Sequence, residues 1–295
     1  MNIRHAEPEP LGHEPLLLGE GPSWDAESRT LGLVDIDGRA FLTVSDDGVT
    51  HAPTPDFVGC AVPWASGLWL AAIGTDVVGL SPNGQHTPFA RLPGDPVRHR
   101  ANDGKSDPAG RFWVGVMARN AAPGAGRLCV VHGDGRTETV LEGLTIPNGL
   151  GWSPDGSVMY VTDTAQGTIS AYDFDAGGGT LARPRPLIRI DPRLGGPDGL
   201  TVDTEGHVWT ALWDGGAVLR IAPDGAVVGV VELPVPRVTS CCFAGPDLTD
   251  LIVTTASVAL DEETLRRYPR SGSTFRVQMN IQGLPPVRFR GGQSG

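Results

Sequence analysis

Short apolar segments alternate with turns rich in glycine, proline and aspartate along the chain, and one such unit recurs. Three segments can be laid over one another, each with an acidic or Ser-Pro turn, a glycine and an aromatic residue in an apolar strand: SDPAGRFWVGV (106–116), WSPDGSVMYVTD (152–163) and VDTEGHVWTAL (202–212). Weaker copies lie at 24–35, 63–73 and 243–255. Because self-similarity of this kind is the signature of repeat architectures, the sequence predicts six copies of one unit.

The spacing of the copies indicates a β-propeller. The strand residue after each turn falls near Gly32, Trp69, Trp113, Tyr160, Trp209 and Ile252, so the period is roughly 37 to 49 residues, as in propeller blades. Hairpin signals between these positions give each repeat about four strands. We therefore expect an all-β, six-bladed β-propeller that occupies residues 1–295 as a single domain.

Helical signal is nearly absent. Only LDEETLRRYP (260–269) has a helix-forming composition, and it is short enough to be one turn in a loop. A TIM barrel, which needs a helix after every strand, is disfavoured. An unpaired edge in the last blade would be exposed, so we expect both chain ends to share that blade, through GSTFRVQMN (272–280) and residues before Glu20.

Charge and composition limit the partners of the protein. The net charge of −11 disfavours nucleic acid and anionic membranes, and the chain has no basic leader segment and no apolar run of membrane-spanning length. We expect a cytoplasmic monomer or weak homodimer that acts on a small molecule. The cysteines lack metal-site spacings and are interpreted as apolar core residues: Cys60, Cys129, Cys241 and Cys242.

Oxygen-bearing side chains recur at one register of the repeat. Counting back five residues from the turn position gives Glu20, Asn102, Asn148 and Asp198. The same count in the second and sixth repeats falls near Gly59 and Thr239, so one side of the channel lacks strong ligands. Equivalent inner-strand positions converge on the axis of a propeller. Carboxylate and amide oxygens suit Ca²⁺, Mg²⁺ or Mn²⁺, although Zn²⁺ also accepts carboxylate.

A purely structural interpretation of these residues is available. Asn or Asp followed by Gly is a common turn signal, and Asn148-Gly149 or Asp198-Gly199 alone would indicate a loop. Their common register across repeats favours a site at the mouth of the channel instead. A positive charge beside a cation centre would be an unusual structural choice, so Arg100 is also assigned to function.

Five stretches carry a family resemblance that covers nearly the whole chain. They are EGPSWD (20–25), RANDGKSDPAGRFWVGVMA (100–118), IPNGLGWSPDG (146–156), GGPDGLTVDTEGHVW (195–209) and TSCCFAG (239–245). They resemble the family of gluconolactonase, senescence marker protein (regucalcin) and luciferin-regenerating enzyme. The resemblance implies one catalytic divalent cation held by Glu20, Asn148 and Asp198. It also implies that Arg100 and Asn102 hold a sugar lactone.

The chain departs from the family pattern at Asn120. Well-studied members have an acidic, substrate-contacting residue after the G-x-M-A segment, whereas this chain has VMARN. An amide accepts hydrogen bonds more weakly than a carboxylate and also donates them, so Asn120 predicts a different hydroxyl pattern in the substrate. With Arg119 adjacent, we expect easier entry of a carboxylate-bearing or less hydroxylated lactone. The alternative is that Asn120 lies on the loop through 121–126 and contacts nothing.

The expected reaction is hydrolysis of a sugar lactone, with the cation polarising the carbonyl and activating water. Asp198 is the candidate for both ligand and general base, and Arg100 and Asn102 would orient the substrate. Phosphotriester hydrolysis, cation binding without turnover, and opening of a lactone that is not a sugar stay open as alternatives. The sequence has no G-x-S-x-G elbow and no phosphate-binding glycine loop in a strand-to-helix context.

Overall fold

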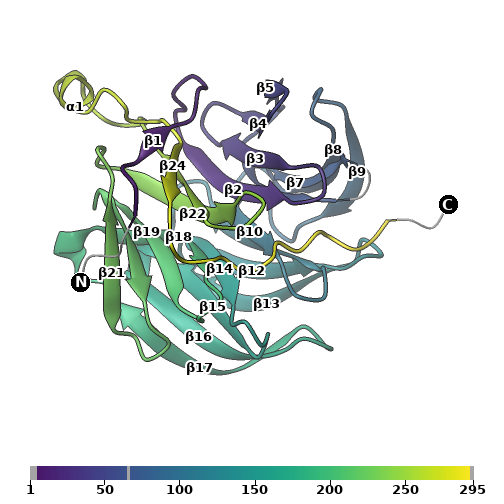
Figure 1. The fold of residues 1–295 in the computed structure, drawn as a ribbon. Coiled ribbons are helices and arrows are strands. Elements are labelled where there is room, and N and C mark those ends of the chain that lie inside the picture. Colours follow the sequence, from purple (N-terminus) through teal and green to yellow (C-terminus); the bar gives the residue numbers. More distant parts are fainter. Residues whose placement is uncertain (1–4, 65–66, 293–295) are drawn as a thin grey trace.

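The computed structural model of the protein describes residues 5–64 and 67–292. Six antiparallel sheets of four strands each surround a central axis (Figure 1). The innermost strands of successive sheets are neighbours around that axis. The all-β, six-bladed propeller predicted from the repeats is thus confirmed.

The strands fall into four sets by their distance from the axis. The innermost strands are β2 (Gly19–Asp25), β6 (Val58–Pro63), β10 (His99–Ser106), β14 (Pro147–Trp152), β18 (Gly196–Val202) and β22 (Val238–Ala244). The second strands are β3 (Thr30–Asp35), β7 (Trp69–Ile73), β11 (Phe112–Ala118), β15 (Val158–Asp163), β19 (Val208–Trp213) and β23 (Asp250–Thr255). All six residues that defined the repeat lie on the second strands.

The outer half of each blade completes the sheet. The third strands are β4 (Ala40–Ser45), β8 (Asp76–Leu80), β12 (Gly126–Val131), β16 (Thr168–Asp175), β20 (Ala217–Ile221) and β24 (Phe275–Gln278). The outermost strands are β5 (Gly48–Pro53), β9 (His86–Arg91), β13 (Thr137–Leu144), β17 (Thr180–Arg189), β21 (Val227–Glu232) and β1 (Glu9–Pro10).

A buried aspartate explains the recurring turn between the first two strands of a blade. In the third blade Asp107 Oδ1 accepts hydrogen bonds from the backbone N–H groups of Ala109 and Arg111, both at 2.9 Å, and its Oδ2 accepts from Trp113 Nε1 at 3.0 Å. Asp203 bonds the corresponding groups of the fifth blade, including Trp209 Nε1 at 2.9 Å. The aspartate and the tryptophan six residues later therefore recur together because one side chain satisfies the other.

The two ends of the chain close the sixth blade, as predicted. Its strand order is β1-β24-β23-β22, and β1 pairs with β24 through Glu9 opposite Arg276 and Pro10 opposite Phe275. An additional bridge joins Leu18 to Ala256. A strand from the N-terminus thus covers the edge that β24 would otherwise expose.

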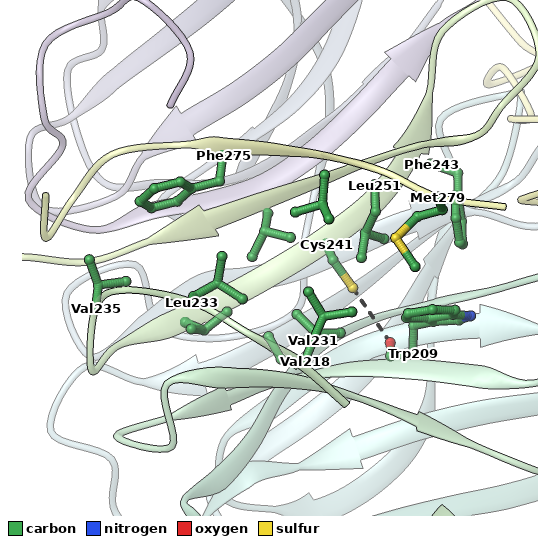
Figure 2. Packing of buried hydrophobic residues seen from close by; sticks show 14 of the residues in the cluster. Trp209, Val218, Val231, Leu233, Val235, Cys241, Phe243, Leu251, Phe275 and Met279 are labelled. Atoms are coloured by element: carbon green, nitrogen blue, oxygen red, sulfur yellow. Dashed lines mark hydrogen bonds between the residues drawn. The ribbon is translucent and has the colours of Figure 1, made fainter. Parts of the chain in front are cut away.

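Apolar side chains fill the space between adjacent blades. Figure 2 shows the core between the fifth and sixth blades, where Trp209 and Phe243 pack edge to face with ring centroids 5.6 Å apart. Cys241 lies in this core, whereas the adjacent Cys242 lies in the core shared with the first blade. All four cysteines are buried and unpaired, which agrees with their interpretation as core residues.

Helical structure is minor. The predicted helical turn is α1 (Glu262–Arg267), and Asp261 Oδ1 caps it by accepting from Thr264 N at 2.8 Å. Within residues 5–64 and 67–292, no helix is both long and apolar enough to cross a membrane.

The segment after β24 crosses one mouth of the channel and forms a strap, residues 280–292 (the yellow trace in Figure 1). It is tied to several blades in turn: Phe289 N donates to Pro63 O at 2.8 Å, and Gly292 N donates to Gly133 O at 2.9 Å. The Arg288 guanidinium forms an ion pair at 2.6 Å with Asp25, the last residue of β2. The strap therefore covers the mouth at which the inner strands end.

Candidate metal centre

The candidate residues occupy the opposite mouth, at irregular positions near the start of each inner strand. Pairing of β2 with β3 shifts register after Glu20, and pairing of β14 with β15 shifts between Pro147 and Leu150. The same shift occurs in all six blades, as in a β-bulge. A bulge re-aims a side chain and is common beside active sites. The common sequence register thus corresponds to a common backbone irregularity.

The glycines that follow the candidate residues allow neighbouring inner strands to approach closely. A Cβ on Gly149 would lie 2.6 Å from Asp198 O, and one on Gly199 would lie 2.0 Å from Ser240 Oγ. Both glycines lie within strands and not in turns. The Asn-Gly and Asp-Gly pairs are therefore not loop signals here, since the glycine provides the space in which the preceding side chain meets its neighbours.

Three of the predicted residues meet in a buried cluster. Asn148 Nδ2 donates hydrogen bonds to Asp198 Oδ1 and, at 3.1 Å, to Thr164 Oγ1. Glu20 is held by the N–H of Gly21, which donates to its Oε2 at 2.9 Å; Gly21 has φ of 51°, a left-handed conformation that suits glycine. Glu20, Asn148 and Asp198 are all buried.

The cluster concentrates negative charge. Burial raises the pKa of Glu20 well above its ordinary value, and the charges of Asp198 and Asp103 add to the rise. The pKa of Asp198 is also raised well above its ordinary value, by burial and then by Asp103. Burial and like charge both favour the neutral form of a carboxyl group, and a nearby positive charge would favour the ionised form.

The donor set fits a divalent cation. The Oδ1 atom of Asn148 is buried and has no hydrogen-bond partner among the described residues, although its Nδ2 has two. An orphaned amide oxygen beside two ionised carboxylates is the arrangement that a hard cation would satisfy. Across residues 5–64 and 67–292, no three His, Cys, Asp or Glu side chains form a metal-binding group by themselves. The amide of Asn148 is therefore needed to complete the set, and the metal-binding role of the three residues stays a prediction.

Asp103 is a member of the cluster that the sequence prediction missed. It is buried, and burial raises its pKa while the charge of Lys105 opposes the rise. Asp103 occupies the position one residue after the register that was counted in each repeat. That position holds glycine in the first, fourth and fifth blades, but an aspartate in the third.

Arg100 and Asn102 lie at the edge of the cluster and contact each other. Arg100 Nη1 donates to Asn102 Oδ1 at 2.8 Å and to the carbonyl of Ala101 at 2.9 Å. Asn102 Nδ2 donates to the carbonyl of Pro147 at 3.1 Å. The amide oxygen of Asn102 thus accepts a hydrogen bond from Arg100, whereas the amide oxygen of Asn148 has no hydrogen-bond partner among the described residues.

The structure places Asn120 outside the buried cluster. It is exposed, and its Oδ1 accepts from Ala122 N at 3.2 Å in the turn after β11. The neighbouring Arg119 forms a two-pronged ion pair with Asp56, with Nη1 3.1 Å from Oδ1. The charge of Arg119 is thus paired with that of Asp56, and an effect of Arg119 on substrate entry stays a prediction. A substrate contact at Asn120 stays a prediction.

A separate cavity of about 230 Å³ occupies the other half of the channel. It is mainly apolar and is closed by Pro285 and Pro286 of the strap. Lys105, whose Nζ donates to Leu200 O at 2.6 Å, also lines it. This cavity is thus distinct from the carboxylate cluster.

Comparison with known proteins agrees with this fold. Residues 18–257 match the family model described as SMP-30/Gluconolactonase/LRE-like region. The chain is 34% identical to regucalcin of Gallus gallus over 293 residues, which cover 96% of this chain and 98% of the relative. Regucalcin of Oryctolagus cuniculus is also 34% identical, over 92% and 95% of the two chains.

Solved structures give the same result. A calcium-binding protein, regucalcin, from Agrobacterium tumefaciens superimposes with a TM-score of 0.92 at 30% identity, over 98% of each chain. A luciferin-regenerating enzyme superimposes with a TM-score of 0.87 at 29% identity, over 94% of this chain and 96% of the other. A gluconolactonase from Xanthomonas campestris, at 19% identity and a TM-score of 0.72 over 93% and 98% of the chains, shares the fold. The chain therefore belongs to the SMP-30/gluconolactonase/LRE-like family.

Proposed function

We propose that the protein is a cation-dependent hydrolase that opens a lactone, with a sugar lactone as the first candidate substrate. Glu20, Asn148 and Asp198 would hold one divalent cation, Ca²⁺, Mg²⁺, Mn²⁺ or Zn²⁺. The observation that carries the proposal is the unpartnered, buried amide oxygen of Asn148, whose Nδ2 is bonded to Asp198, a carboxylate that raises the pKa of Glu20. Family membership supports the same conclusion.

A bound cation would supply a Lewis acid for the ester carbonyl and lower the pKa of water. The remaining roles belong to side chains of this protein. Asp198 is the candidate general base. Asn148 holds one of its oxygens, and the carboxylate lies in the cluster where the attacking water would bind. Arg100 and Asn102, fixed by their mutual hydrogen bond, would orient the ring and its hydroxyl groups.

The proposal is tested by a lactone panel assayed with metal-free protein and each of the four cations. Ring opening is expected only with an added cation, and it should be lost in Asp198→Ala. Paraoxon and diisopropyl fluorophosphate belong in the same panel, because their hydrolysis in place of lactone opening would identify a phosphotriesterase. A lactone rate that is unchanged by a chelator would contradict the cation requirement.

A second candidate is cation binding without turnover. It is favoured by one specific comparison, since the relative from Agrobacterium tumefaciens is described as a calcium-binding protein. In that case Ca²⁺ would bind and stabilise the protein, but no member of the panel would be hydrolysed with any cation. Cation-dependent turnover of any lactone excludes this candidate.

A further inference from the structure

Three arginines surround one phenylalanine ring beside the metal centre. The guanidinium carbons of Arg39, Arg119 and Arg100 lie 5.0, 5.2 and 5.9 Å from the centre of the Phe57 ring. A sphere of 5.9 Å radius around one ring therefore holds three cationic groups, in a protein whose net charge is −11. We call Arg39, Phe57, Arg100 and Arg119 the arginine cluster.

The arginine cluster lies at the same mouth of the channel as the carboxylates. Arg39 is in the turn after β3, whose last residue, Asp35, pairs with Gly19 next to Glu20. Arg119 directly follows β11, whose end pairs with the start of β10, where Arg100 lies. Arg100 is also bonded to Asn102. A ligand at the carboxylate cluster would thus face the guanidinium groups.

The three arginines differ in how their charge is compensated. The two terminal nitrogens of the Arg119 guanidinium donate hydrogen bonds to the two carboxylate oxygens of Asp56. Over residues 5–64 and 67–292, Arg39 and Arg100 form no ion pair, and the bonds of Arg100 use only Nη1. Burial lowers the pKa of Arg100, and the exposed Asp37 opposes this shift without a contact ion pair. Two guanidinium groups are therefore left to bind an external anion.

We propose that Arg39 and Arg100 form an anion subsite that selects lactones bearing a carboxylate or a phosphate on the side of the ring away from the ester. This inference rests on the proposed lactone hydrolysis. Planar guanidinium groups bind carboxylate and phosphate through paired hydrogen bonds, and Phe57 provides an apolar wall beside them. The Arg119–Asp56 pair holds the cluster in place across the blades.

Binding of open-chain sugar acids tests the subsite without turnover. Wild-type protein in Ca²⁺ is titrated calorimetrically with gluconate, with glucarate, which adds a carboxylate, and with 6-phosphogluconate, which adds a phosphate. We expect glucarate, 6-phosphogluconate or both to bind at least about tenfold more tightly than gluconate, as a charge-assisted pair would produce. The two acids distinguish a carboxylate subsite from a phosphate subsite.

A matched pair of variants assigns the effect to the arginine cluster. Arg39 and Arg29 both lie in turns of the first blade and have a left-handed backbone, with φ of 52° and 53°. Arg29 differs in its place, because the turn between β2 and β3 lies at the mouth of the channel that the strap covers. Asparagine tolerates this conformation. Arg39→Asn should reduce the preference for the second anion to less than about threefold, and Arg29→Asn should leave it unchanged. Asp37→Asn should increase it, because it removes the competing carboxylate.

The outcomes separate this inference from the proposed function. Equal binding of all three acids, no binding of any, or an equal loss in Arg29→Asn would overturn the subsite. A preference for the doubly charged acids without hydrolysis of any lactone would retain the subsite and overturn the hydrolase. Hydrolysis of glucono-1,5-lactone, with neither glucarate nor 6-phosphogluconate bound more tightly than gluconate, would retain the hydrolase and overturn the subsite.

Discussion

The substitution Asp198→Asn should stabilise the metal-free protein while it removes cation binding. The variant keeps the shape of the side chain and an oxygen that can accept the hydrogen bond from Asn148. It removes a buried carboxylate whose charge raises the pKa of Glu20, so Glu20 is relieved as well. A buried polar group without a partner costs about 1 to 3 kcal/mol, so we expect a gain of about 1 to 3 kcal/mol.

The sign of the pH dependence follows from the raised pKa values. A carboxyl group whose pKa is raised by folding destabilises the folded state fully above its folded-state pKa, and this cost disappears as the pH falls toward the unfolded-state value. The advantage of Asp198→Asn over wild type should therefore be largest at about pH 8 and shrink toward about pH 5.

Thermal unfolding with a chelator and with each cation provides the assay. At roughly 2 °C per kcal/mol for a chain of this size, the variant should melt about 2 to 6 °C above wild type in the chelator. A cation at 1,000 times its dissociation constant should stabilise wild type by about 4 kcal/mol and the variant far less. A variant that melts below wild type in the chelator, or a wild type that no cation stabilises, would refute the reasoning.

Three further predictions concern the frame and the pocket. Deleting residues 1–15 removes β1 and exposes the edge of β24, so the melting temperature should fall by at least about 5 °C, and an unchanged value would count against closure by the N-terminus. Gly199→Ala should lower the free energy of unfolding by at least about 2 kcal/mol and remove most of the activity, because its Cβ would lie 2.0 Å from Ser240 Oγ. Gly12→Ala, whose Cβ would have nothing within 4 Å, should leave the free energy of unfolding unchanged in chemical denaturation. Asn120→Glu should change the ratio of kcat/KM for gluconolactone over a deoxy lactone by more than about threefold, and a smaller change would place Asn120 outside the substrate pocket.

The fold could be predicted because its repeat contains residues that are close in sequence and hydrogen-bond to one another. In the third and fifth blades the aspartate at the turn bonds the backbone of that turn and the tryptophan of the next strand, as Asp107 and Trp113 do. Such a unit leaves the same spacing in the sequence each time. The strap is different, because its contacts with the blades mostly involve backbone carbonyls, which any residue provides.

The repeat could identify at most one site residue in each blade, because one position was counted in each copy. The register identified Glu20, Asn148 and Asp198, which the structure brings together, but counting one position per repeat passed over Asp103. The bulge makes two consecutive residues relevant, and among the four blades with a candidate oxygen ligand at the first position, only the third has a side chain at the second, Asp103. The pairing of Arg119 with Asp56 joins positions 63 residues apart that share no periodic relation, so no sequence pattern indicates it.

Anomalous diffraction from crystals grown with Mn²⁺ tests the central claim most directly. The account predicts one strong peak in the channel, bound by Glu20, Asn148 Oδ1 and Asp198 at about 2.0 to 2.6 Å, the usual range for hard cations and oxygen ligands. It also predicts that the peak disappears in Asp198→Asn. A peak on other residues, or these three side chains turned away from one another around no ion, would contradict the account.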